Sequence, residues 1–141
     1  MKNALVILSI LLINITSFSK SLIDKLEAES GTYSGVNIST SNNGYSGTGY
    51  LTNFNEASDY VTFTINAPED GTYDLEFRYR SEYGDKYQNL HINGILINRI
   101  KFPNNSNFST FYAGQIELKK GNNTISVYSD WGYIDLDFLE V

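Results

Sequence analysis

The chain has 141 residues, a length that suits one domain with a single hydrophobic core. It carries 10 basic and 16 acidic side chains, and the net charge of −6 argues against nucleic acid and anionic membrane surfaces as partners. Cysteine is absent, which excludes stabilisation by disulfides and makes a bound metal ion worth seeking.

The first twenty residues have the pattern of a secretory signal. Lys2 supplies the positive start, residues 4–15 are almost entirely apolar, and residues 17–19 offer small side chains for cleavage. An apolar run of about a dozen residues is shorter than the roughly 20 that a membrane-spanning helix needs. We therefore predict a signal peptide over 1–19, a short linker over 20–25 and one module over 26–141, in a secreted, extracellular protein.

Short segments of alternating apolar and polar residues fill the rest of the chain. Residues 22–26 read as a weak helical or linker piece, and the polar runs 40–49 and 103–109 read as loops. Asn93-Gly94 is a strong hairpin turn because both residues tolerate positive φ. We expect strands over 33–39, 60–66, 72–80, 87–92, 95–102, 110–118, 123–128 and 133–141. This spacing predicts an all-β fold, a β-sandwich of the jelly-roll kind with about 8 to 10 antiparallel strands.

The C-terminal stretch combines three features that other parts of the chain lack. It holds the only tryptophan, Trp131, two carboxylates at Asp135 and Asp137, and an apolar row. Ile134, Leu136 and Phe138 form that row, and their alternation predicts that all three enter the core.

Acidic residues occur twice at a spacing of two, as Glu27 with Glu29 and as Asp135 with Asp137. On a strand such residues point the same way about 6.6 Å apart, so each pair concentrates negative charge. Oxygen ligands without His or Cys suit calcium, and solvated acids on a strand edge are the alternative. A glycosidase pair of carboxylates has weaker support, because the sequence indicates neither a cleft nor an acid of raised pKa. His91 falls inside an expected strand and is interpreted as structural.

Aromatic residues outside the expected strands are candidates for binding a sugar. A pyranose ring has an apolar face that Trp or Tyr can cover while polar neighbours bond its hydroxyls. Trp131 is the best platform because Gly132 leaves space beside its ring, although a tryptophan closing the end of the sandwich is the alternative.

Together, these residues resemble carbohydrate-binding module family 35 over about residues 26–141. The motifs fall in the order of that family, and the loop Tyr83-Gly84-Asp85-Lys86 with Trp131-Gly132-Tyr133 is similar to the branch attached to glycoside hydrolase family 26 β-mannanases. The other motifs are Glu27-Ala28-Glu29, residues 44–50, residues 71–75, Tyr79-Arg80, Ile92-Asn93-Gly94, Phe102-Pro103, Leu118, residues 121–125 and Asp135-Leu136-Asp137.

The resemblance implies a jelly roll with a structural calcium and a β-mannan ligand, galactomannan or glucomannan. Matched position by position, it assigns calcium to Glu27, Glu29 and Asp137, with a carbonyl of residues 46–50 as a further ligand. It assigns the sugar to Trp131 and Gly132, with the adjacent positions Tyr83, Lys86, Tyr87, Gln88 and Tyr133. Tyr133 departs from the family pattern, which frequently has a second tryptophan there.

The resemblance also implies a non-catalytic module that directs an appended or associated mannanase to its polysaccharide. We expect a monomer, either a fragment of a mannanase precursor or a free-standing binding protein. A uronic-acid- or xylan-binding member of the same family, a hydrolase fragment and a cell-surface adhesin are the alternatives.

Overall fold

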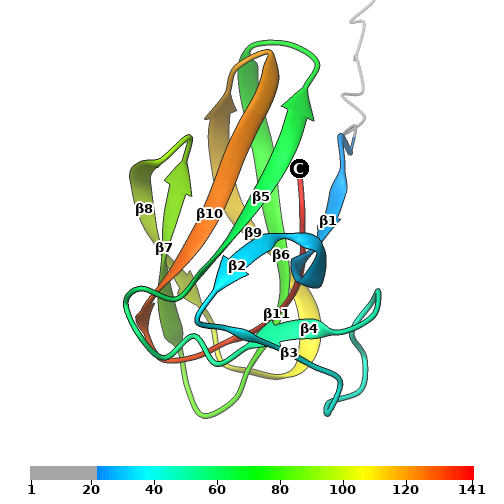
Figure 1. The fold of residues 1–141 in the computed structure, drawn as a ribbon, viewed down its shortest axis with the longest axis vertical. Coiled ribbons are helices and arrows are strands. Elements are labelled where there is room, and N and C mark those ends of the chain that lie inside the picture. The colour runs from blue at the N-terminus through cyan, green and yellow to red at the C-terminus, as the bar shows by residue number, and fades with distance from the viewer. Residues whose placement is uncertain (1–21) are drawn as a thin grey trace, which may run out of the picture.

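The computed structural model describes residues 22–141 and folds them into two antiparallel β-sheets that face each other (Figure 1). The β-sandwich predicted from the alternation pattern is confirmed. The predicted signal peptide and residues 20 and 21 of the predicted linker lie outside the described residues. Within residues 22–141, no helix is long and apolar enough to cross a membrane.

One sheet has six strands and contains both ends of the described chain. Its main path is β3 (Asn37–Ser39), β4 (Tyr50–Thr52), β11 (Asp135–Glu140), β6 (Gly71–Ser81) and β9 (Asn105–Leu118). The sixth strand, β1 (Lys25–Glu27), pairs with the C-terminal half of β11, beside which it runs in Figure 1. The backbone N–H groups of Ile23 and Asp24 also donate to the carbonyl oxygen of Val141.

The other sheet has five strands. Its order is β2 (Thr32–Ser34), β5 (Tyr60–Ala67), β10 (Gly121–Trp131), β7 (Lys86–Ile92) and β8 (Ile95–Phe102). A single 3₁₀ turn, η1 (Ala28–Ser30), links β1 of the first sheet to β2 of the second. The hairpin tip at Asn93 and Gly94 has positive φ at both residues, as the sequence predicts.

The core fills the space between the inner faces of the two sheets. On β6 the inward residues are Leu75, Phe77 and Tyr79, all at most 2% exposed. The facing sheet contributes alternate residues of β5 and β10, which include Val61, Phe63, Ile65, Ile125 and Val127. This period of two is what lets one face of each strand bury apolar area.

Three expected elements differ in the structure. The single strand expected over 33–39 is two strands in different sheets, because Gly35 with φ +77° turns the chain between them. The helical or linker piece expected over 22–26 contains β1 instead. The loop expected over 103–109 ends early, since β9 begins at Asn105 and its Ser109 pairs with Tyr79.

A β-bulge in β11 breaks the expected apolar alternation. Its register with β6 moves from Leu136 opposite Tyr79 to Phe138 opposite Arg78, so Asp137 is the extra residue. Leu136, Leu139 and Val141 therefore enter the core. Phe138 is buried as predicted, at 8% exposed, but its ring lies 4.0 Å from the Lys25 ammonium, outside the cluster between the two sheets.

Candidate functional site

An exposed aromatic surface lies where β10 ends. Trp131, the last residue of β10, is 57% exposed, and Tyr133 two residues later is 45% exposed. Tyr83, in the turn between β6 and β7, is 82% exposed. The alternative in which Trp131 closes the end of the sandwich is therefore wrong, and its ring is available to a ligand. We call Trp131 and Tyr133 the aromatic platform.

Gln88 fixes the turn that carries the aromatic platform. Its side chain is 1% exposed, its Nε2 donates to the Gly132 carbonyl over 2.6 Å, and its Oε1 accepts from the Asp130 N–H over 3.1 Å. Gln88 thus holds the backbone on both sides of Trp131. This predicted site residue positions the platform and is too buried to line an open binding surface.

Lys86 lies beneath the aromatic platform with its ammonium between the two rings. The Nζ atom is 5.4 Å from the Trp131 ring centroid and 5.6 Å from that of Tyr133, and it donates to the Tyr83 carbonyl over 3.2 Å. Lys86 is only 7% exposed, and no carboxylate of residues 22–141 pairs with it. A buried ammonium with donors to spare favours an oxygen-rich ligand.

Tyr87 supports Trp131 from the neighbouring strand. The two rings meet nearly edge to face with centroids 6.4 Å apart. The guanidinium of Arg99 on β8 lies over Tyr87, 4.1 Å from its centroid, and pairs with Asp130. Arg99 and Asp130 are site neighbours that the sequence analysis missed. Their only signal was the alternation of Arg99 and Lys101 on β8, which does not reveal which residues lie opposite.

The loop that carries Tyr83 is held by polar contacts with the segment after β8. The Gly84 N–H donates to Asn104 Oδ1 and the Asn104 N–H donates to Asp85 Oδ1, each over 2.9 Å. Lys101 pairs with Asp85 over 2.7 Å and, with the Asn104 N–H, holds the pKa of that carboxyl below its usual range. Tyr83 itself has φ +63°, a strained conformation for a tyrosine, and these contacts hold the residues that follow it in the loop.

A second polar cluster gathers around the turn at residues 46–48. The Ser46 N–H donates to Asp137 Oδ1 over 2.9 Å, and its hydroxyl donates to the Glu27 carboxylate. The Thr48 N–H donates to Glu29 Oε1 over 2.7 Å. A Cβ on Gly47 would lie 2.2 Å from Glu29 Oε1, so only glycine allows this approach. The three acids that the resemblance assigns to calcium are thus collected by one turn.

Cations already neutralise part of this cluster. Lys25 Nζ lies 2.7 Å from Glu27 Oε1, and Arg78 Nε lies 2.8 Å from Asp137 Oδ2. Burial raises the pKa of Asp137, and the Glu27 charge adds to this, while the Ser46 N–H and Arg78 act the other way. Asp135 lies apart from the cluster, paired with Arg80 and bonded by the Thr52 hydroxyl.

The oxygen-rich cluster fits a calcium ion in its chemistry. The side-chain atoms that could ligate the ion are carboxylate and hydroxyl oxygens. One of them, Glu29 Oε2, is buried without a hydrogen-bond partner among the described residues. The acids do not, however, converge as a formed ligand set. Within residues 22–141 no three His, Cys, Asp or Glu side chains are placed to hold a metal.

Comparison with known proteins identifies relatives over nearly the whole described domain. The profile of the family described as carbohydrate binding module (family 35) matches residues 24–141. A mannan endo-1,4-beta-mannosidase of Thermothelomyces thermophilus is 39% identical over 111 residues, which are 79% of this chain and 23% of that protein.

Solved structures agree with this assignment. The GH26-CBM35 β-(1,4)-mannanase of Podospora anserina superposes with a TM-score of 0.78 and 37% identity over 83% of this chain and 26% of that one. A family 35 carbohydrate binding module from Clostridium thermocellum gives 0.76 and 26% identity, with coverage of 83% and 95%. The chain therefore spans about a quarter of the mannanases it matches and nearly all of an isolated module.

Proposed function

Because the chain belongs to carbohydrate-binding module family 35, we propose that it binds β-mannan through the aromatic platform of Trp131 and Tyr133. That family is the one that the sequence motifs resemble. Mannan is the proposed ligand because relatives that are 36–39% identical to this chain are mannan endo-1,4-beta-mannosidases and a β-(1,4)-mannanase. The observation that carries the proposal is that Trp131 is 57% exposed in a turn whose backbone is held by the buried Gln88 side chain.

In this proposal the aromatic rings contact the apolar face of the sugar, and polar side chains bond its hydroxyls. Stacking on one aromatic ring contributes only about 0.5–1.5 kcal/mol beyond area burial, so the sugar hydroxyls need polar partners. Lys86 supplies a buried ammonium between the two rings, and it donates to the carbonyl of the exposed Tyr83. Gln88 and Tyr87 keep the platform in place, so we assign them positioning roles.

The module itself is non-catalytic in this proposal. Its partner is a catalytic domain, appended or associated, whose substrate it holds, as the relatives that combine such a module with a mannanase suggest. We further propose a monomer exported by the signal peptide expected over 1–19, and a structural calcium held by Glu27, Glu29 and Asp137. Calcium would neutralise the excess of acids around residues 46–48. Its role in this proposal is structural and not catalytic.

An acidic sugar is the second candidate ligand. The buried Lys86 ammonium has no carboxylate partner among the described residues and would pair with a uronate. The net charge of −6 does not favour this reading, because a chain with an excess of acids attracts anionic polysaccharide less than a basic one does.

Affinity electrophoresis on glucomannan, galactomannan, xylan and pectin gels tests the proposal with wild type, Trp131→Ala and Lys86→Met. We expect retardation on the two mannans, its loss in Trp131→Ala, and an affinity at least about tenfold lower in Lys86→Met, since a charged hydrogen bond contributes about 1.5–3 kcal/mol. Lys120→Met, which changes an exposed lysine in the turn before β10, is the matched control and should bind as wild type. Retardation on pectin alone would support the uronate reading, and no retardation on any gel would overturn the proposed function.

A further inference from the structure

A β-bulge in β10 decides which side chains surround Trp131. The register of β10 with β7 moves from Ser129 opposite Gln88 to Trp131 opposite Tyr87. Asp130 is therefore the extra residue of the bulge. Because Ser129 is buried, a strict period of two would point Trp131 inward as well. The bulge instead places Trp131 with Tyr87 on the outer side of the five-stranded sheet.

An ion pair crosses the sheet beside this bulge. Arg99 of β8 pairs with Asp130 of β10 over 2.5 Å, and β7 lies between these two strands. The guanidinium carbon of Arg99 lies over the Tyr87 ring, 4.1 Å from its centroid. That ring in turn meets the Trp131 ring with centroids 6.4 Å apart. The Arg99–Asp130 pair therefore borders the aromatic platform on the side of Tyr87.

The side chains of this pair have hydrogen-bonding groups to spare. They are 52% exposed for Arg99 and 31% exposed for Asp130, so a ligand can reach both. Within residues 22–141, the one side-chain hydrogen bond of either residue is the bond that Arg99 Nε donates to Asp130 Oδ2. The other guanidinium N–H groups and Asp130 Oδ1 are thus open to an outside partner.

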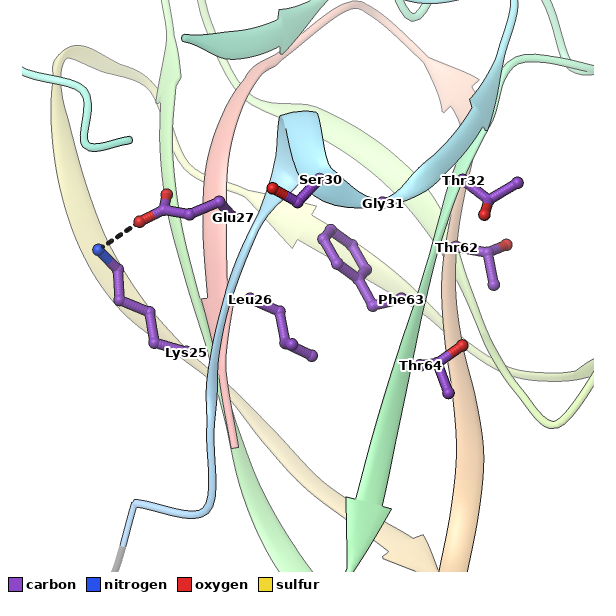
Figure 2. Close-up of a pocket in the computed structure, with 9 residues that line it drawn as sticks. All are labelled: Lys25, Leu26, Glu27, Ser30, Gly31, Thr32, Thr62, Phe63 and Thr64. Atoms are coloured by element: carbon purple, nitrogen blue, oxygen red, sulfur yellow. Dashed lines mark ion pairs between the residues drawn. The ribbon is translucent and has the colours of Figure 1, made fainter. Parts of the chain in front are cut away.

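Another ion pair of the domain shows the difference. Lys25 and Glu27, joined by the dashed line in Figure 2, both bond the Ser46 hydroxyl in addition to each other. That pair has its polar groups used within the fold. The side chains of Arg99 and Asp130 have no third hydrogen-bonding partner in the described part of the chain, so water or a ligand must supply one.

The charges of the pair fix the kind of ligand that it fits. Arg99 and Asp130 together have no net charge, which favours a neutral ligand over an ionic one. An apolar surface over them would leave charged groups without hydrogen bonds, which is costly. Sugar hydroxyls would replace the water there, because each hydroxyl both donates and accepts.

We propose that Arg99 and Asp130 bind the hydroxyls of a second sugar ring, next to the ring that stacks on Trp131 in the proposed function, on which this inference rests. Arg99 donates to one hydroxyl, Asp130 accepts from a neighbouring one, and Tyr87 holds the guanidinium in place. The 6.4 Å between the Tyr87 and Trp131 centroids is comparable with the spacing of neighbouring rings in a polysaccharide. The two positions therefore suit consecutive rings of one chain.

The alternative is that the pair only supports Tyr87 and, through it, Trp131. A supporting role affects every ligand of the platform alike, including a single sugar ring. A binding role affects only ligands that are long enough to reach Arg99 and Asp130. The length of the ligand therefore separates the two roles.

Titrations with methyl β-mannoside and with mannotetraose, followed by the Gly132 amide shift of the ¹⁵N-labelled protein, test the inference. Arg99→Met removes the donors and keeps a long side chain, whereas Asp130→Asn keeps an oxygen for Arg99 and replaces the free acceptor by a donor. Asp70→Asn is the matched control, because Asp70 belongs to an exposed ion pair in the turn before β6. Thermal melting checks that each variant is folded.

We expect wild type to bind mannotetraose more tightly than methyl β-mannoside. For mannotetraose, the Kd should rise about fivefold or more in Arg99→Met and about threefold or more in Asp130→Asn, because the lost groups are charged but partly exposed. For methyl β-mannoside, the Kd should stay within about twofold in both variants. Asp70→Asn should match wild type with both ligands.

The outcomes separate this inference from the proposed function. An equal loss of affinity for both ligands in Arg99→Met and Asp130→Asn would overturn the second sugar position and give the pair a supporting role. Unchanged Kd values for both ligands would also overturn it. Either result leaves the platform, since wild type still binds. No Gly132 shift in wild type with either sugar would overturn the proposed function and this inference with it.

Discussion

At the scale of single residues, Gly132 decides whether the aromatic platform and its cation can coexist. Its φ of +75° is one that side chains rarely adopt, and a Cβ there would lie 2.3 Å from Lys86 Cδ. The stem of Lys86 thus occupies the space that a side chain at position 132 would need. The glycine between Trp131 and Tyr133 makes room for the lysine below the rings, in addition to the space beside the tryptophan that the sequence suggested.

Gly132→Ala should therefore lower both stability and mannan binding. The left-handed backbone costs an alanine about 1–3 kcal/mol, and the displaced Lys86 carries its ammonium away from the rings. Gly94→Ala is the matched control, because its φ is +79° and no atom lies within 4 Å of the added Cβ. Both variants should melt earlier, and only Gly132→Ala should lose retardation on glucomannan gels. Equal binding by the two variants would contradict this role of Gly132.

Tyr79 provides a pH-dependent probe of the core. Burial, with a smaller effect of the Asp85 charge, raises its pKa to about 12 from an ordinary value of 10.0. Between these two values the unfolded chain releases the phenol proton and the folded chain keeps it. The contribution of this group to stability is therefore fully present below pH 10 and is lost as the pH rises towards 12. The loss is up to about 3 kcal/mol, because each unit of difference in pKa corresponds to about 1.4 kcal/mol.

Tyr79→Phe should remove that part of the alkaline loss. Urea unfolding at pH 8, 10 and 11 measures it as a shallower decline in the free energy of unfolding than in wild type. At pH 8 the variant should be about 1 kcal/mol less stable, because the hydroxyl bond to the Pro103 carbonyl is gone. Tyr73→Phe, which loses an exposed bond to Glu69, should decline as wild type does. A parallel decline in Tyr79→Phe would refute the assignment.

At the scale of elements, β6 and β11 form a charged ladder on the outer side of the six-stranded sheet. Arg78 and Arg80 of β6 pair with Asp137 and Asp135 of β11, and the bulge in β11 brings the second acid to its arginine. Two carboxylates this close in sequence on one strand repel each other unless nearby cations neutralise them. The neutralising groups are the two arginines on the paired strand β6.

Arg80→Met should be strongly destabilising, since it leaves Asp135 buried without its cation. The side chains of this pair are 12% and 8% exposed, and breaking a buried pair from one side costs about 3–5 kcal/mol. Lys101→Met breaks an exposed pair with Asp85 and should cost less than about 1 kcal/mol. Chemical unfolding measures both, and Asp135→Asn added to Arg80→Met should restore part of the loss. Similar losses in the two single variants would argue against a structural role for the ladder.

At the scale of the whole molecule, the two ends of the domain close on each other. β1 pairs with β11, and the turn at residues 46–48 binds acids from both ends, Glu27 and Glu29 near the start and Asp137 near the finish. An ion bound there would stabilise the closure of the entire sandwich. The structure instead has the Lys25 ammonium on Glu27, so binding of the ion would have to displace it.

Removing calcium should lower the melting temperature of the domain. A ligand present at about 100 times its Kd contributes about 2.7 kcal/mol, which corresponds to roughly 10 °C for a domain of this size. Thermal melts with EDTA and with added calcium measure the difference. Glu29→Gln should abolish the response, and Glu56→Gln, an exposed acid outside the cluster, should retain it. Identical melting curves with and without EDTA would count against the calcium site.

The sequence by itself determined the sandwich, because alternation with a period of two and frequent turn residues leave few other ways to bury one face of each strand. It also determined the family, which the match over residues 24–141 confirms, because the motifs span the domain in order. The expectation that Trp131 is exposed was also correct. It rested on a local feature of the sequence, the glycine that follows the tryptophan.

Only the tertiary structure decided which groups meet across strands. The bulge at Asp137 placed the buried Phe138 outside the cluster between the sheets, and the pairing of β7 with β8 and β10 brought Arg99 and Asp130 to Tyr87. It also buried Gln88, which the motif alone had grouped with residues at the surface. Period and propensity are properties of a segment, whereas register, bulges and strand order are set by packing between segments far apart in the chain.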